Sequence, residues 1–280
     1  MATDKKNKFL IVFLVFIFAL ILRLWNLNQM GRTWDEPFYV DQGYKIADSI
    51  KKGDFKNNIL HTDPDPPVLS KYLFGLAQHL NIDRLIPCDS DFCNYDFTSS
   101  RLVSVLFSSL TVVLVILIGW EYVSFFTGIC AGLIFSTLPI FLGLSQLVTV
   151  ESILVFFFTA CVYSFLNLTK KFSVKNIIIC GILLGFAIAT KYTNIMLIPL
   201  LAFVWYLFVR GGKKKKIFEK KLITIPLIAF GVLFIIWPFP WFHLDYVLKW
   251  EHAIRFSEVA SHPVPEVFFG RLVQVPIFYY

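Results

Sequence analysis

Two adjacent carboxylates, Asp35 and Glu36, follow the first long apolar run of the sequence. Pro37 comes next, and proline favours the first turn of a helix, so we expect both acids at or just before a helix N-terminus. There the positive end of the helix dipole stabilises a negative charge and keeps a carboxylate ionised, as a general base must be. A helix cap explains the same spacing equally well, so these residues alone leave both interpretations open.

Three further charged residues stand at the ends of apolar runs. Glu151 interrupts one such run, Arg101 precedes another, and Lys191 separates two more. A carboxylate within an apolar helix end is costly unless it faces a polar cavity or the solvated interface. We expect Arg101 and Lys191 on the same, outer side of the membrane as Asp35, where the positive-inside bias disfavours basic residues. They therefore indicate a bound anion, or side chains that snorkel to the interface. Weaker candidates for the same cluster are His61, Lys71 and Arg255.

Carboxylates beside cations suit the transfer of a sugar from a lipid phosphate. The leaving group is a phosphate anion, which needs cations but no strong general acid. The acceptor hydroxyl needs a carboxylate to take its proton while its oxygen attacks the anomeric carbon. Ordinary glycosidases need two carboxyl groups because their leaving group is an alkoxide. One base and one cationic phosphate site would therefore be enough.

The composition places this chemistry at a membrane. Of the 280 residues, 57% are hydrophobic, whereas soluble domains are about 45–50% apolar. The formal net charge of +7 could suggest a nucleic-acid partner. The basic residues, however, cluster between apolar runs, as membrane topology demands, and we expect no nucleic acid to bind. The sequence therefore predicts an all-α polytopic membrane protein in contact with membrane lipid.

Apolar runs near the length of about 20 residues that crosses a bilayer predict the spans. These are residues 9–25, 102–120, 125–144, 150–168, 177–189, 194–209 and 222–241. The main basic loops then fall on one side, which the positive-inside rule identifies as cytoplasmic. We therefore expect an integral protein of the cell membrane with a cytoplasmic N-terminus. Its active site, and residues 26–100 and 242–280, would be extracytoplasmic.

The first outer segment, residues 26–100, has the pattern of a structured region. Apolar residues recur at helical spacing over 39–50 and predict one amphipathic helix. A second, nearly apolar helix is predicted over 68–80, too short to span a bilayer and suited to the interface. Cys88 and Cys93 in the same segment form either a local disulfide or two free thiols.

In their order along the chain, these motifs resemble those of the protein O-mannosyltransferase-like and aminoarabinose-transferase-like membrane glycosyltransferases, in family 39 of the GT-C superfamily. The matching segments are Arg23-Leu24, Trp34-Asp35-Glu36-Pro37 with Tyr39, Asp65-Pro66-Pro67-Val68-Leu69-Ser70-Lys71, Arg101-Leu102, Glu151, residues 185–192, His262-Pro263, Phe269-Gly270 and Pro276. The family's histidine before Pro-Pro is replaced here by Asp65, with His61 nearby. Members continue into further spans, so a sequence ending at Tyr280 is expected to be truncated or split.

The resemblance implies a GT-C-type helix bundle that transfers a sugar, with inversion, from a polyprenyl-phosphate donor to a hydroxyl of a lipid, glycan or protein. It implies Asp35 as the catalytic base and Glu36 as its partner. The implied acceptor or donor pocket contains Glu151, His61, Asp65 and Tyr39, and the implied phosphate-binding residues are Arg101, Lys191, Lys71 and Arg255. We expect no metal site and no cofactor besides the lipid-linked sugar.

The sequence predicts a single transmembrane module over residues 1–280. Two functions other than glycosyl transfer stay open for it. A transporter or flippase of an anionic lipid or lipid-linked sugar would place its essential charges near the bilayer midplane, in broken helices. The charges described above instead fall at the predicted outer interface. A non-catalytic membrane assembly subunit gains support if the chain ends naturally at Tyr280.

Overall fold

The structure is a computed structural model, which describes residues 2–33, 35–54, 68–80, 96–210, 219–237, 265–268 and 271–274. The chain forms two compact units, Met1–Trp237 and Pro238–Tyr280. In the second unit, strands β1 (Pro265–Phe268) and β2 (Arg271–Gln274) pair antiparallel, with Pro265 opposite Gln274. This short hairpin is an addition to the all-helical fold that the sequence predicts.

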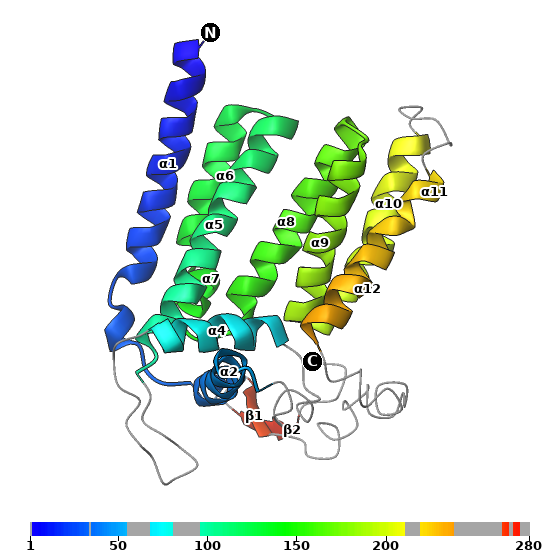
Figure 1. The fold of residues 1–280 in the computed structure, drawn as a ribbon. Coiled ribbons are helices and arrows are strands. Elements are labelled where there is room, and N and C mark those ends of the chain that lie inside the picture. The colour runs from blue at the N-terminus through cyan, green and yellow to red at the C-terminus, as the bar shows by residue number, and fades with distance from the viewer. Residues whose placement is uncertain are drawn as a thin grey trace. The chain divides into compact units, whose positions relative to one another are not determined.

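The first unit is a bundle of apolar helices whose successive members run in opposite directions (Figure 1). Its elements are α1 (Ala2–Leu24), α5 (Thr98–Tyr122), α6 (Phe125–Thr137), α7 (Pro139–Leu144), α8 (Val150–Lys170), α9 (Val174–Thr190), η2 (Tyr192–Met196), α10 (Leu197–Arg210), α11 (Glu219–Leu222) and α12 (Thr224–Ile236). Among the residues that the structure describes, three helices are long and apolar enough to cross a membrane, namely α5, α8 and residues 6–24 of α1. Shorter apolar helices occupy the positions of the other predicted spans.

One predicted span, over residues 125–144, is interrupted rather than continuous. Leu138 leaves the helical conformation, with φ −63° and ψ 114°, because a residue before proline is pushed out of the α region. Pro139 then begins α7, where its fixed φ suits the first turn. Lys191 is extended in the same way, with φ −154° and ψ 126°, and separates α9 from η2, as its position between two apolar runs predicted.

Two helices, α2 (Asp35–Lys51) and α4 (Val68–Leu80), lie across one end of the bundle, which we call the α2–α4 end (Figure 1). Their backbones touch where they cross. A Cβ atom on Gly43 would collide with the carbonyl oxygen of Lys71, and one on Gly75 would collide with the backbone of Gly43. Glycine at both positions therefore permits the crossing. Both helices were predicted from the sequence, and α4 has the predicted bounds.

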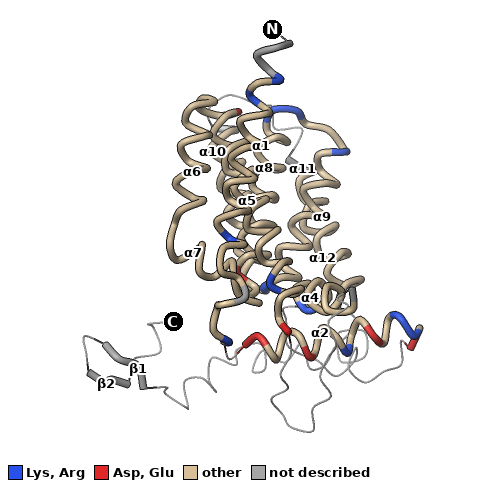
Figure 2. The backbone as a smooth tube through the Cα atoms, turned by 90° about the vertical axis from the view of Figure 1, so that its left-hand side faces the viewer, with Lys and Arg blue, Asp and Glu red and all other residues tan. Residues whose placement is uncertain are grey.

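Basic residues gather at the opposite end of the bundle (Figure 2). They lie near the start of α1, where α8 meets α9, and in α11, and they are Lys6, Lys8, Lys170, Lys171, Lys175 and Lys221. These residues share one end because successive helices run in opposite directions, as the sequence predicted. The turns that carry Arg101, Glu151 and Lys191 consequently lie at the α2–α4 end. The α2–α4 end also carries basic residues, among them Lys45 of α2 and Lys71 of α4.

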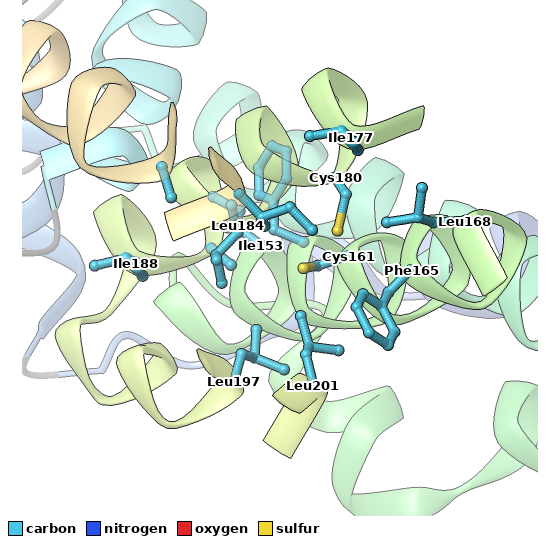
Figure 3. Packing of buried hydrophobic residues seen from close by; sticks show 14 of the residues in the cluster. Ile153, Cys161, Phe165, Leu168, Ile177, Cys180, Leu184, Ile188, Leu197 and Leu201 are labelled. Atoms are coloured by element: carbon cyan, nitrogen blue, oxygen red, sulfur yellow. The ribbon is translucent and has the colours of Figure 1, made fainter. Parts of the chain in front are cut away.

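The main hydrophobic core lies between α8, α9, α10 and α12 and extends to the α2–α4 end. Figure 3 shows the thiols of Cys161 on α8 and Cys180 on α9 facing each other within it. Val40 of α2 and Phe74 of α4 belong to the same cluster, and both are fully buried. The two crossing helices are therefore packed firmly onto the bundle, which fixes the side chains at the start of α2.

Candidate active site

Asp35 and Glu36 are the first two residues of α2, and their side chains lie in different environments. Asp35 is exposed, whereas Glu36 is completely buried. Successive residues of an α-helix point in directions about 100° apart, so one of two neighbours can face the packed bundle while the other faces outward. The two adjacent acids are thus separated physically, which the sequence alone did not predict.

Glu36 forms a buried ion pair with Arg101 of α5. The Arg101 Nε donates to Oε1 of Glu36 at 2.8 Å, and Nη2 donates to Oε2 at 2.9 Å. Such bidentate pairs combine strength with a fixed geometry. The same carboxylate accepts from the backbone N–H groups of Thr33 at 2.9 Å and Val148 at 3.0 Å. One side chain therefore ties together the segment before α2, helix α5 and the loop before α8.

Arg101 donates its remaining hydrogen bonds to backbone carbonyls in the segment after α1. Its Nη1 reaches the carbonyl oxygens of Leu27 and Met30, both at 3.1 Å, and Nη2 reaches that of Gly31 at 3.0 Å. With the two bonds to Glu36, all five N–H groups of the guanidinium are engaged within the chain. Phosphate binding, the role that the sequence suggested for Arg101, would require these bonds to break.

The ionised state of Glu36 is maintained against burial. Burial raises the pKa of this carboxyl, but the hydrogen bonds from Arg101, Thr33 and Val148, together with the positive charge of Arg101, lower the pKa below its ordinary value. Hydrogen bonds to a charged form favour that form. A carboxylate that is buried and held in this way is a poor acceptor for a substrate proton, so Glu36 fits a positioning role.

Asp35, Tyr39 and Glu151 form an electrostatic group at the start of α2. Tyr39 follows Asp35 by four residues, so both lie on the same side of the helix. Burial raises the pKa of Tyr39 to about 12, and the negative charges of Asp35 and Glu151 act in the same direction. The phenol therefore keeps its proton at neutral pH. The structure brings together three residues that the sequence assigned to the catalytic base and its pocket.

Glu151, in the first turn of α8, also pairs with Lys191. The Lys191 Nζ lies 3.7 Å from Oε1 of Glu151, and the two side chains are 42% and 38% exposed, respectively. The backbone beneath Lys191 is fixed, because its N–H donates to Ala187 and its carbonyl accepts from the Asn194 N–H at 2.9 Å. The buried amide of Asn194 donates to the Ala187 carbonyl at 2.8 Å. A loosely held ammonium thus stands on a rigid turn.

The other predicted site residues lie elsewhere or outside the described residues. Lys71 of α4 is buried, with its ammonium 5.1 Å from the centre of the Phe38 ring on α2, a distance at which cation and ring attract. The predicted residues whose structure is not described are His61, Asp65 and Arg255, and the same holds for Trp34, Cys88 and Cys93. Within the described ranges, no group of three His, Cys, Asp or Glu residues could share a metal ion.

Sequence reasoning missed one charged residue close to the acidic motif. Arg32 is exposed, with its guanidinium 5.6 Å from the centre of the Phe97 ring, and the guanidinium of Arg101 lies 5.8 Å from the same ring. A basic residue three positions before Asp35 was a usable signal. The backbone donors of Thr33 and Val148 carried no such signal, because every residue except proline has an N–H group.

Residues 92–241 match the protein family described as dolichyl-phosphate-mannose-protein mannosyltransferase. The matched segment contains Arg101, Glu151 and Lys191 and begins after α2 and α4.

The fold is similar to a solved structure of the S. cerevisiae protein O-mannosyltransferase Pmt1-Pmt2 complex bound to the sugar donor. The TM-score is 0.52 at 20% identity, over 88% of this chain and 34% of that chain. This chain thus spans about a third of that protein, and at such identity the likeness shows the fold, which confirms the predicted GT-C-type bundle. No curated protein matches the sequence.

Proposed function

This chain belongs to the dolichyl-phosphate-mannose-protein mannosyltransferase family, and from that premise we propose that it transfers a sugar from a polyprenyl-phosphate donor to an acceptor hydroxyl at the α2–α4 end. One observation carries the proposal: an exposed acid at a helix N-terminus, Asp35, is grouped with Tyr39, Glu151 and the accessible ammonium of Lys191. We propose further that this end is extracytoplasmic and the N-terminus cytoplasmic. The acceptor would be a lipid, glycan or protein.

Asp35 is the proposed general base. Asp35 is the first residue of α2, and its exposure lets an acceptor approach. Asp35 would take the hydroxyl proton as the acceptor oxygen forms a bond to the anomeric carbon. The bond from that carbon to the phosphate oxygen breaks, and polyprenyl phosphate leaves as an anion. Attack from the face opposite the leaving group inverts the anomeric configuration.

Lys191 is the proposed cation for the donor phosphate. Its ammonium is partly exposed on a fixed turn, and a Lys side chain can direct three donors at an anion. Arg32 is a second candidate, because its guanidinium is exposed, whereas Arg101 is engaged within the fold. Lys71 and Arg255 remain proposed members of the phosphate site, and His61 and Asp65 of the sugar or acceptor pocket.

The Glu36–Arg101 pair is proposed to position the base rather than to react. Its bonds join the residues before α2 to α5 and to the loop before α8. The backbone of Asp35 is adjacent to this network, so its direction depends on the pair. A displacement of the order of 1 Å can cost about a hundredfold in rate, which makes such a pair important without contact to substrate.

Transport of a lipid-linked sugar is the alternative from another class. It would favour essential charges in broken helices near the bilayer midplane. Asp35, Glu151 and Lys191 instead lie at helix ends, at the start of α2, the start of α8 and the end of α9. This placement favours transfer at the membrane surface.

The decisive experiment measures transfer from labelled polyprenyl-phosphate mannose in membranes that contain the full chain. Asp35→Asn should lower the rate by about a hundredfold to ten-thousandfold, the usual contribution of a positioned base. Asp41→Asn is the matched control, because Asp41 lies on the same helix and pairs with Lys45 at its surface. Undiminished turnover in Asp35→Asn membranes would contradict the assignment of the base.

A further inference from the structure

We propose that Lys191 and Glu151 form an exchange pair, in which the donor phosphate displaces Glu151 from Lys191 and releases that carboxylate toward Asp35 and Tyr39. The inference rests on the proposed function, because it takes a lipid phosphate as the ligand of Lys191. It goes beyond that function in giving Glu151 two successive partners. Glu151 would thereby set the affinity for the donor.

The pair is loose enough to exchange. Its separation of 3.7 Å exceeds hydrogen-bonding distance, and its side chains are 42% and 38% exposed. Exposed pairs of this kind shift an equilibrium by about fivefold at most. A phosphate oxygen at hydrogen-bonding distance from the ammonium makes a stronger, charge-assisted bond. Replacement of the carboxylate by the phosphate is therefore favourable.

Exchange requires side-chain movement alone. The Lys191 backbone is held by Ala187 and Asn194 at the end of α9, and Glu151 lies within the first turn of α8. The four-carbon stem of Lys191 can redirect its ammonium without disturbing either helix. The donor phosphate would therefore meet a lysine whose backbone is already in place.

The transfer reaction strengthens the attraction between the phosphate and the ammonium of Lys191. The donor is a phosphodiester with one negative charge, and the leaving group is a phosphomonoester with up to about two charges. Lys191 therefore interacts more strongly with the departing phosphate than with the donor, which is the condition for accelerating the reaction.

The released Glu151 would then face the place where an acceptor must enter. Its charge already acts on Tyr39 together with that of Asp35. Without Lys191, the carboxylate can accept a hydrogen bond from an acceptor hydroxyl beside the base. Donor occupancy would thus favour acceptor binding, and by linkage the acceptor would favour the donor.

The test is a double-mutant cycle on binding of polyprenyl phosphate, without its sugar, to the full chain in lipid nanodiscs. Glu151→Gln should bind about two- to fivefold tighter than wild type, because the competitor for Lys191 is removed. Lys191→Gln should bind about ten- to hundredfold more weakly. In the Lys191→Gln background, Glu151→Gln should have no effect. The control is Glu121→Gln, which removes the pair with Lys170 at the other end of the bundle and should leave binding unchanged.

Steady-state kinetics provide a second test of the exchange. With polyprenyl-phosphate mannose as donor, Glu151→Gln should lower the donor KM and also lower kcat, since it loses the released carboxylate. Glu151→Asp keeps the charge and should stay near wild type in donor KM. Thermal unfolding of each variant identifies any loss that merely reflects misfolding.

Two results would overturn the exchange: equal binding by wild type and Glu151→Gln, or the same tightening with and without Lys191. Failure of the wild-type chain to bind polyprenyl phosphate would instead overturn the proposed function. An arm with phosphatidylglycerol identifies the source of the phosphate. If that lipid shows the same dependence on Glu151 and Lys191, the ligand is bulk lipid and the donor assignment falls.

Discussion

Two ion pairs lie at the α2–α4 end, and they differ in burial and in the distance between their charged atoms. Glu36 and Arg101 meet at 2.8 Å, with the carboxylate completely buried. Glu151 and Lys191 are 3.7 Å apart, with both side chains more than a third exposed. In the sequence all four residues are charges at the edges of apolar segments. In the structure, one pair is part of the framework and the other is accessible to a ligand.

The difference shows that a charge at the correct end of a bundle is insufficient to identify a ligand contact. Arg101 is at the correct end, but all five of its N–H groups already have acceptors in the chain. A ligand would have to replace those bonds inside a buried site, where an unpaired charge is very costly. Within the described part of the chain, the ammonium of Lys191 has one loose contact with an acid, so a ligand loses little by displacing that acid.

The largest effect should come from breaking the buried pair. Arg101→Met leaves the Glu36 carboxylate buried without its cation, and such a loss costs about 3–5 kcal/mol of unfolding free energy. The melting temperature of the purified protein should fall sharply, and transfer should be lost with it. Thermal unfolding followed by tryptophan fluorescence measures the change.

A second variant distinguishes the effect of the Glu36–Arg101 pair on stability from its effect on transfer. Glu36→Leu combined with Arg101→Met removes both charges, so stability should recover relative to Arg101→Met alone. Transfer should remain impaired, because the segment that positions Asp35 is no longer clamped. Full recovery of transfer in the double variant would show that the pair does not position the base.

Much of the fold was predictable because hydrophobic periodicity and proline act locally. The bounds of α4 and the start of α2 at Asp35 follow from prolines and from apolar spacing. The order and direction of the apolar helices follow from run length and loop charge. The interruption at Leu138 had a local signal in Pro139, which the length of the surrounding apolar run concealed.

The different roles of the charged residues in the site could not be predicted in this way. Arg101 and Glu36 are 65 positions apart in the sequence, and their pairing depends on how α2 packs across the bundle. The partners of Arg101 are mostly backbone carbonyls, which carry no residue-specific signal. The grouping of Asp35, Tyr39 and Glu151 was expected from the family resemblance, and the structure brings them close without assigning their roles.

A different buried arginine sharpens the comparison. Arg23 in α1 is as buried as Glu36, yet among the described residues its Nε and Nη2 have no hydrogen-bond partner. Only Nη1 donates, to Ala19 at 3.0 Å and to Ser136 at 3.5 Å. Replacing an incompletely satisfied buried charge by an apolar side chain is often neutral or stabilising by about 1–4 kcal/mol. Arg23→Met should therefore keep or raise the melting temperature; a clear fall would show that these nitrogens have partners.

The pH dependence of stability should also report on the buried pair. The pKa of Glu36 lies below its ordinary value of 4.5, so the folded state holds the carboxylate more strongly ionised than the unfolded chain does. The resulting stability is present above that ordinary value and is lost as the pH falls through the folded-state pKa. Melting temperatures measured from neutral to acidic pH should decline more steeply for wild type than for Glu36→Gln. Parallel curves would contradict the lowered pKa.

The exposed pair should give the smallest change in stability. Lys191→Gln and Glu151→Gln should each alter the unfolding free energy by less than about 1 kcal/mol, because both charges remain solvated when the partner is removed. Transfer by Lys191→Gln should nevertheless fall, since the donor phosphate loses its cation. The same thermal-unfolding and transfer assays measure both quantities. If either variant were as unstable as Arg101→Met, Lys191 and Glu151 would belong to the framework, and the site would need another cation for the phosphate, for which exposed Arg32 is the first candidate.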